Sequence, residues 1–230
     1  MRIAYFIPTV LVVLLAGCTS SSPTPPTPTT ATDNGVAALS ADQIVARAQT
    51  ALGQEKSYRI KGDVANGDQT TSIDLQNGGQ NVKGTLALNG QTLEILRTGN
   101  DLYLKASDAF WKNVIPAEQQ SALAMLSGKY VKVDATNESF GVLTEAFDPS
   151  EILKVRGTVA KGASTTVNGT PAIGVVSEDE KATLFVATVG QPRPLRITGD
   201  MGDVEFTDFG ETIEFTPPAS SEVFDLKSLK

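Results

Sequence analysis

Apolar and polar residues alternate along many short segments of the chain. In residues 57–65, for example, Tyr58, Ile60 and Val64 fall on one side of an extended backbone, and Arg59 and other polar residues fall on the other. This period of two, with turn residues about every 8 to 12 positions, predicts antiparallel strands with one solvent-facing side. In the first half of the chain we expect strands at 57–65, 70–76, 81–89, 91–98 and 100–106.

The same pattern returns in the second half, after a less regular stretch. Asn168-Gly169 and the acidic run Glu178-Asp179-Glu180 fall between alternating segments, as hairpin turns do. We expect strands at 129–133, 153–160, 164–169, 170–178, 182–188, 194–200, 203–209 and 212–218. Allowing for merged or broken segments, the chain is predicted to hold ten to twelve strands.

Residues typical of the beginnings and ends of helices predict three or four short helices. Ser40 and Gln43 make a capping box, and Gly53 marks the end of the helix that follows. A second helical stretch at 115–129 has Pro116 at its start and Gly128 as its stop, and a third at 148–154 begins with Asp-Pro-Ser-Glu. The order of elements is therefore strands, helices and strands, which favours an α+β fold.

The apolar face of such a sheet is larger than these helices cover. Ten strands of about 20 Å, spaced about 4.8 Å apart, present roughly 1,000 Å². Three helices about 15–20 Å long and about 10 Å wide cover roughly 450–600 Å². The sheet must then close into a barrel, meet a partner, or curve into a half-barrel with an apolar cavity. A plain α+β core with shorter strands is the remaining alternative.

The N-terminus has the pattern of an export signal. Arg2 precedes an apolar run at 3–15, which is shorter than the about 20 residues of a membrane-spanning helix. Leu15-Ala16-Gly17-Cys18 then looks like the lipobox of bacterial lipoproteins, in which cleavage precedes a cysteine that carries a diacylglyceryl group. An ordinary secreted protein with an incidental cysteine is the competing interpretation. Residues 1–17 are thus predicted to be a lipoprotein signal peptide, with Cys18 as the lipidation site.

A Ser/Thr/Pro-rich tract separates this cysteine from the alternating segments. Residues 18–39 contain four prolines within six positions and lack an apolar pattern, which is typical of a linker. Residues 40–230 are then one predicted domain, large enough for its own core. As Cys18 is the only cysteine, the domain has no internal disulfide.

Charge and composition exclude several function classes. Removing residues 1–17 leaves 18 Lys+Arg against 26 Asp+Glu, a net charge of 18 − 26 = −8, which argues against nucleic acid as a partner. The chain has no histidine, so Ser/His/Asp and Cys/His catalysis are excluded and zinc loses its commonest ligand. No phosphate-binding glycine loop is present, and the acidic residues are scattered. We therefore expect neither enzymatic activity nor a metal or other cofactor.

Several longer segments resemble a known group of lipoproteins. These are YRIKGDV, GNDLYLKASDAFWKNV, MLSGKYVKV, ATLFVATVGQPRPLRI and VEFTDFGETIEFTPP. With the lipobox, the linker and the capped helix before them, they resemble the LppX/LprG group of actinobacterial lipoproteins, which belongs with LolA/LolB-like half-barrels. The resemblance runs from about Ser40 to the C-terminus. It implies a strongly curved antiparallel sheet with helices on its concave face, and a hydrophobic cavity for lipids or glycolipids.

The sequence therefore predicts a monomer anchored by lipid to the outer face of the bacterial cell membrane. It would bind acyl chains of a lipid or glycolipid and help to carry them across the envelope, with a membrane transporter as a further partner. The alternative is an anchored sensory or protein- or cell-wall-binding module with a filled core. The residues expected to line the cavity are Ile60, Ile73, Leu86, Leu88, Leu93, Ile95 and Leu104 on the sheet, and Phe110, Trp111, Leu123, Leu126, Leu143 and Phe147 in a movable cover.

Overall fold

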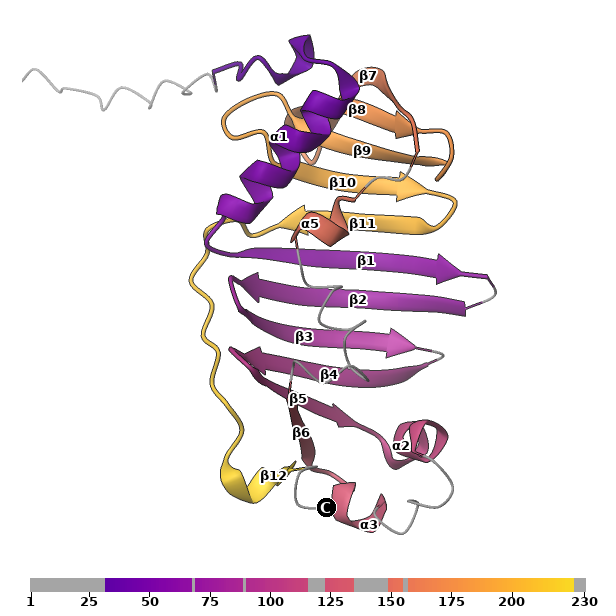
Figure 1. Ribbon diagram of the computed structural model, residues 1–230, viewed down its shortest axis with the longest axis vertical. Coiled ribbons are helices and arrows are strands. Elements are labelled where there is room, and N and C mark those ends of the chain that lie inside the picture. The colour runs from indigo at the N-terminus through magenta and orange to yellow at the C-terminus, as the bar shows by residue number, and fades with distance from the viewer. Residues whose placement is uncertain are drawn as a thin grey trace, which may run out of the picture. The chain divides into compact units, whose positions relative to one another are not determined.

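One open sheet forms the framework of the protein (Figure 1). The computed structural model describes residues 32–67, 69–88, 90–115, 123–134, 149–154 and 157–225. In these residues, twelve strands follow one another in the order β12-β6-β5-β4-β3-β2-β1-β11-β10-β9-β8-β7, and only β12 and β6 are parallel. The strands are β1 Tyr58–Asn66, β2 Gln69–Gly78, β3 Asn81–Leu88, β4 Gln91–Thr98, β5 Asp101–Ala106, β6 Tyr130–Asp134, β7 Val159–Val167, β8 Thr170–Ser177, β9 Ala182–Ala187, β10 Pro194–Gly199, β11 Gly202–Thr207 and β12 Val223–Asp225.

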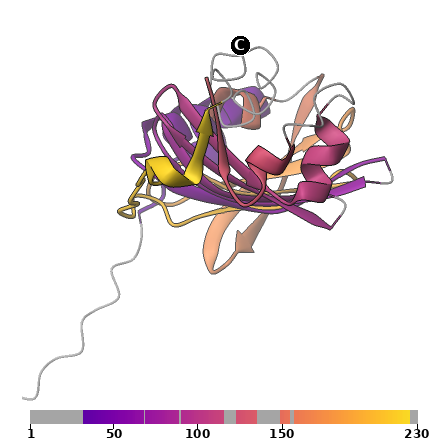
Figure 2. The same ribbon diagram turned by 90° about the horizontal axis from the view of Figure 1, so that it is seen from below.

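The helices lie on one side of this sheet, its concave side (Figure 2). Helix α1 crosses the half formed by β8 to β11, with α5 beside it, whereas α2 and α3 lie at the end that carries β5 and β6 (Figure 1). The predicted α+β fold, a strongly curved sheet of ten to twelve strands left open as a half-barrel, is confirmed. The helices are α1 Ala41–Gln54, α2 Asp108–Val114, α3 Leu123–Leu126 and α5 Pro149–Ile152, with 3-10 turns η1 Val36–Ala38 and η4 Ser220–Glu222. In this described part of the chain, none of the helices combines the length and hydropathy needed to cross a membrane.

Helix α1 begins as its sequence predicts and ends slightly later. The Ser40 hydroxyl accepts from the Gln43 N–H, and the Gln43 side chain accepts from the Ser40 N–H, so the capping box is formed. The sequence predicts an end at Gly53, but this glycine lies inside α1. The helix stops where Glu55 turns extended, and the Arg193 side chain binds the Glu55 carboxylate at 2.6 Å. The end of α1 is thus joined to a residue distant in sequence.

Replacing Ser40 by alanine should weaken the start of α1. The substitution leaves the Gln43 N–H without its side-chain acceptor, and losing such a cap costs about 1 kcal/mol. Urea denaturation should show this loss with an unchanged dependence on denaturant. Arg47→Ala, on the exposed face of the same helix, is the control and should change the unfolding free energy by less than about 0.5 kcal/mol. Equal effects of the two substitutions would contradict a specific capping role.

Two apolar clusters occupy the concave face. The first packs α1 and Leu153 against β1 and β8 to β11, with fully buried Ile44, Ala48 and Leu52 on the helix. The second packs α2 and α3 against β2 to β6. Ile73 on β2 packs against both clusters. The sheet is therefore covered in two patches that meet near its centre.

Three expected elements differ in the structure. The strands predicted at 153–160 and 164–169 meet in one strand, β7, whose register shifts between Lys161 and Ser164. A helix precedes the expected one, because Ser107 accepts from the Phe110 N–H and starts α2. The segment 212–218 is not a strand. It runs over the opposite face of the sheet, where its Glu214 carbonyl accepts a hydrogen bond from Lys83. Its prolines have no backbone N–H to donate to a neighbouring strand.

Candidate functional site

A cavity of about 650 Å³ lies between the concave face of the sheet and α5. This volume falls within the range of about 300–1,000 Å³ that small-molecule sites occupy. Most of the side chains around it are aliphatic, and they come from both halves of the sheet and from α5. The lining residues are Ile60, Val64, Thr71, Ile73, Leu75, Leu86, Ile152, Leu153, Lys154, Val159, Val175, Ser177, Glu180, Ala182, Leu184, Ile197, Gly199, Met201, Gly202 and Val204.

The register of the strands brings these side chains to one face. Ile60 pairs with Leu75 across β1 and β2, and Ile73 pairs with Leu86 across β2 and β3. Because side chains at alternate positions share a face, each pair places two aliphatic groups on the concave side. The apolar alternation seen in the sequence therefore becomes a continuous cavity floor.

Gly62 lies in the middle of this floor, between Ile73 on β2 and Val204 on β11. A Cβ atom built on Gly62 would lie 2.0 Å from the Asp203 carbonyl oxygen. Any larger residue would push β11 away from β1, so the close approach of the two backbones requires glycine here.

Polar groups are few along the cavity, and several are already bonded. The Ser177 hydroxyl accepts from the Glu180 N–H at 3.2 Å, and Lys154 Nζ binds the Glu151 carboxylate at 3.0 Å. At the turn between β10 and β11, Met201 also lines the cavity, and 57% of its surface is exposed. A neutral apolar ligand therefore fits the interior better than a charged one.

The half of the sheet under α2 and α3 is packed. Its residues belong to the second cluster, in which Trp111 and Leu126 of the helices are buried against the sheet. Phe110 meets Trp111 edge to face, with ring centroids 5.3 Å apart and an interplanar angle of 84°. The cavity therefore stops where this cluster begins, around Leu86, which belongs to both.

The sequence-predicted cavity residues fall into three groups. Ile60, Ile73 and Leu86 line the cavity. The residues of the second cluster lie beside it instead: Leu93, Ile95, Leu104, Trp111 and Leu126 are buried there, and Leu88, Phe110 and Leu123 pack against it partly exposed. Cys18, Leu143 and Phe147 lie outside the described residues. Contact of any of these side chains with lipid, and lipidation of Cys18, stay predictions.

Sequence reasoning missed the side of the cavity formed by β8 to β11 and α5. Val175, Leu184, Ile197 and Val204 line it from four successive strands, and Ile152 lines it from α5. Alternation in these segments predicts the strands and which residues share a face. It does not show that these faces join those of β1 to β3, because that pairing is made by β1 and β11, which are distant in sequence.

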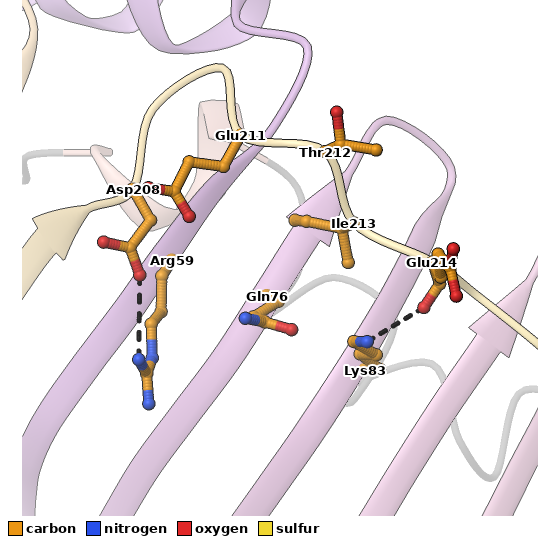
Figure 3. A pocket seen from close by; sticks show the side chains of 8 residues that line it. All are labelled: Arg59, Gln76, Lys83, Asp208, Glu211, Thr212, Ile213 and Glu214. Carbon is orange, nitrogen blue, oxygen red and sulfur yellow. Dashed lines mark hydrogen bonds and ion pairs between the residues drawn. The ribbon is translucent and has the colours of Figure 1, made fainter.

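The opposite face of the sheet carries a separate, polar pocket of about 270 Å³ under residues 208–214 (Figure 3). Arg59 donates two hydrogen bonds of 2.7 Å to Asp74 and lies 3.6 Å from Asp208. The hydrogen bond from Arg59 holds the pKa of Asp74 below its usual value. Lys83 Nζ donates to the Glu214 carbonyl at 2.9 Å. Both of these cations thus bind protein groups. Their contacts with Asp208 and Glu214 hold residues 208–214 against the sheet.

Tyr130 on this opposite face should make the protein sensitive to alkali. Burial, followed by the 2.9 Å hydrogen bond to the Glu94 carboxylate, raises the pKa of Tyr130 from 10.0 to about 12. The folded state therefore favours the neutral phenol, and this contribution to stability is complete below pH 10.0 and lost as the pH rises to about 12. The unfolding free energy, measured by denaturation at about pH 9 and at about pH 11.5, should fall less between these two pH values for Tyr130→Phe than for wild type. Equal losses in both proteins would contradict this assignment.

Solved structures with a similar arrangement include two mycobacterial proteins, one of them described as a lipoprotein, LppX. LprF from Mycobacterium bovis is 16% identical, with 78% of this chain and 97% of that chain covered and a TM-score of 0.49. LppX from Mycobacterium tuberculosis is 13% identical, with 80% and 100% covered and a TM-score of 0.46. An uncharacterized conserved protein from Thermus thermophilus is 11% identical, with 80% and 98% covered and a TM-score of 0.42.

LppX, one of the two proteins that give their names to the group which the sequence resembles, is among these structures, and the likeness concerns the fold alone. No protein-family model and no curated protein matches the chain.

Proposed function

We propose that this protein is an exported, lipid-anchored carrier that binds acyl chains of a lipid or glycolipid and helps to move them across the cell envelope. The observation that carries the proposal is the aliphatic cavity of about 650 Å³ on the concave face. At about 30 Å³ for each water-sized group, it has room for about 20 such groups, comparable with the carbons of one long acyl chain.

The surroundings of the cavity suit an apolar cargo. Ile73, Ile197 and Val204 remain partly exposed although they line the interior, so a bound chain would remove more apolar surface from water. The exposed Met201 at the end of β10 offers an apolar contact through which a chain could leave or reach a membrane. The predicted anchor at Cys18 and the following linker would keep the domain near such a surface.

Mass spectrometry of organic extracts tests the proposal. Protein carrying Cys18→Ala and expressed without residues 1–17 has no covalent lipid, so every extracted lipid is bound non-covalently. We expect about one lipid per protein molecule, recovered reproducibly after washing. Absence of stoichiometric lipid from repeated preparations would favour the alternative, a binding or sensory module without lipid cargo.

A further inference from the structure

Trp111 carries a buried hydrogen-bond donor for which the described residues supply no acceptor. The side chain is 5% exposed, and within this part of the chain its indole Nε1 has no hydrogen-bond partner. Buried N–H groups nearly always have an acceptor, because leaving one unpaired sacrifices its hydration without replacement. An unpaired indole N–H in a packed cluster therefore points to an acceptor that arrives with a ligand.

The surroundings of Trp111 do not suit a water molecule in that role. The described members of its cluster are aliphatic or aromatic, and Phe110, its neighbour on α2, meets the indole edge to face. A buried water needs two to four polar partners, whereas the side chains that pack around the indole in this cluster are apolar. The missing acceptor is therefore better supplied by an oxygen on an otherwise apolar molecule.

The cluster around Trp111 lies next to the cavity on the same concave face of the sheet. Leu86 lines the cavity and pairs across the sheet with Leu93, which belongs to the Trp111 cluster. Ile73 packs against both regions. An acyl chain in the cavity could thus extend along the same concave face and reach the indole by replacing aliphatic contacts of α2 and α3.

Such a replacement would break few hydrogen bonds between the described residues of α2 and α3. The Ser127 hydroxyl, just beyond α3, donates to the Asp108 carboxylate at 3.0 Å on an exposed surface. The contacts of the two helices within the cluster are apolar, and Phe110 and Leu123 are only partly buried. Acyl methylenes can take the place of such contacts without leaving a polar group unpaired.

We propose that Trp111 Nε1 donates a hydrogen bond to an ester carbonyl of the cargo, so that the carrier selects neutral ester-linked lipids. This inference rests on the proposed function. An ester carbonyl is a neutral acceptor located at the end of an acyl chain. A free carboxylate would bring a charge among apolar side chains, and burying an unpaired charge is costly. An ether-linked lipid would lack the carbonyl altogether.

A competition between ester and ether lipids tests this contact. The full chain is incubated with vesicles of ether-linked phosphatidylcholine that contain equal amounts of dioleoylglycerol and its ether analogue dioleylglycerol. Mass spectrometry of the re-isolated protein gives the ratio of the two bound lipids. We expect the ester to be enriched about three- to tenfold, the range that one neutral hydrogen bond supplies.

Trp111→Phe should bind both lipids about equally, because its ring preserves the packing and lacks the donor. Tyr130→Phe, on the opposite face of the sheet, should keep the wild-type ratio. A wild-type ratio near one, or an unchanged ratio in Trp111→Phe, would overturn the inference while leaving the carrier function standing. Failure of the wild type to retain either lipid would overturn both.

Fluorescence provides a second readout if Trp111→Phe does not fold. Trp111 is the only tryptophan of the chain, so the emission reports on this position alone. Dioleoylglycerol brominated along its chains should quench the wild-type emission by at least about half relative to the unbrominated lipid at the same occupancy, because bromine quenches only on close approach. Unchanged emission with bound brominated lipid would refute the contact.

Discussion

Ile73→Asp is expected to reduce the amount of retained lipid by more than about tenfold while the protein stays folded. Ile73 lines the cavity near its centre and packs against both apolar clusters. In the empty protein its position is partly exposed, so a carboxylate there keeps some of its hydration. A bound acyl chain would remove that water and leave the charge without a partner, at a cost of several kcal/mol.

Thr70 gives a matched control. It lies on the same strand but on the opposite face, where it is exposed and pairs across the sheet with Ala65. Thr70→Asp introduces the same charge outside the cavity and should leave lipid retention unchanged. Retention is measured as moles of extracted lipid per mole of protein, with circular dichroism as the check on folding. Normal retention by folded Ile73→Asp would mean that lipid does not occupy this cavity.

Leu52→Ala should lower the unfolding free energy by about 2–5 kcal/mol. Leu52 is fully buried on α1, in the cluster that joins this helix to the sheet. Truncation removes its apolar contacts and leaves a void, because α1 is held in place along its length by Ile44 and Ala48 and cannot close the gap. Since a domain is stabilised by about 5–15 kcal/mol in total, this is a large share of its stability.

Guanidinium or urea denaturation of the same protein preparation measures this loss. Arg47→Ala is the control, because Arg47 lies on the exposed face of the same helix and should change the unfolding free energy by less than about 0.5 kcal/mol. A loss below about 1 kcal/mol for Leu52→Ala would indicate that α1 covers the sheet without contributing to its core.

The parts of the fold that the sequence predicts are those specified by residues close together in the chain. The strands from Tyr58 to Ala106 are hairpins joined by short turns, and their alternation and turn residues lie within a few positions of each other. The capping box at Ser40 is equally local. Elements that depend on distant contacts are the ones that the sequence misses: β12 is a strand because it pairs with β6, which is distant in sequence.

The candidate site shows the same division. Alternation assigns Ile60, Ile73 and Leu86 to the apolar face, and the structure places all three in the cavity lining. The same alternation assigns Leu93, Ile95 and Leu104 to that face, but α2 and α3 cover them. Burial under a helix and exposure to a cavity have the same sequence pattern, because both require apolar side chains at every second position.

The sequence by itself determined the local elements and their faces: the strands from Tyr58 to Ala106, which side of each is apolar, and where α1 begins. These properties depend on backbone propensity and on neighbours a few residues away. The tertiary structure alone decided that β1 joins β11, which combines two halves of the chain into one curved sheet, and that the cavity lies under α5 while the Trp111 cluster is filled. Those outcomes depend on long-range pairing and on the fit between helix and sheet, which no local pattern encodes.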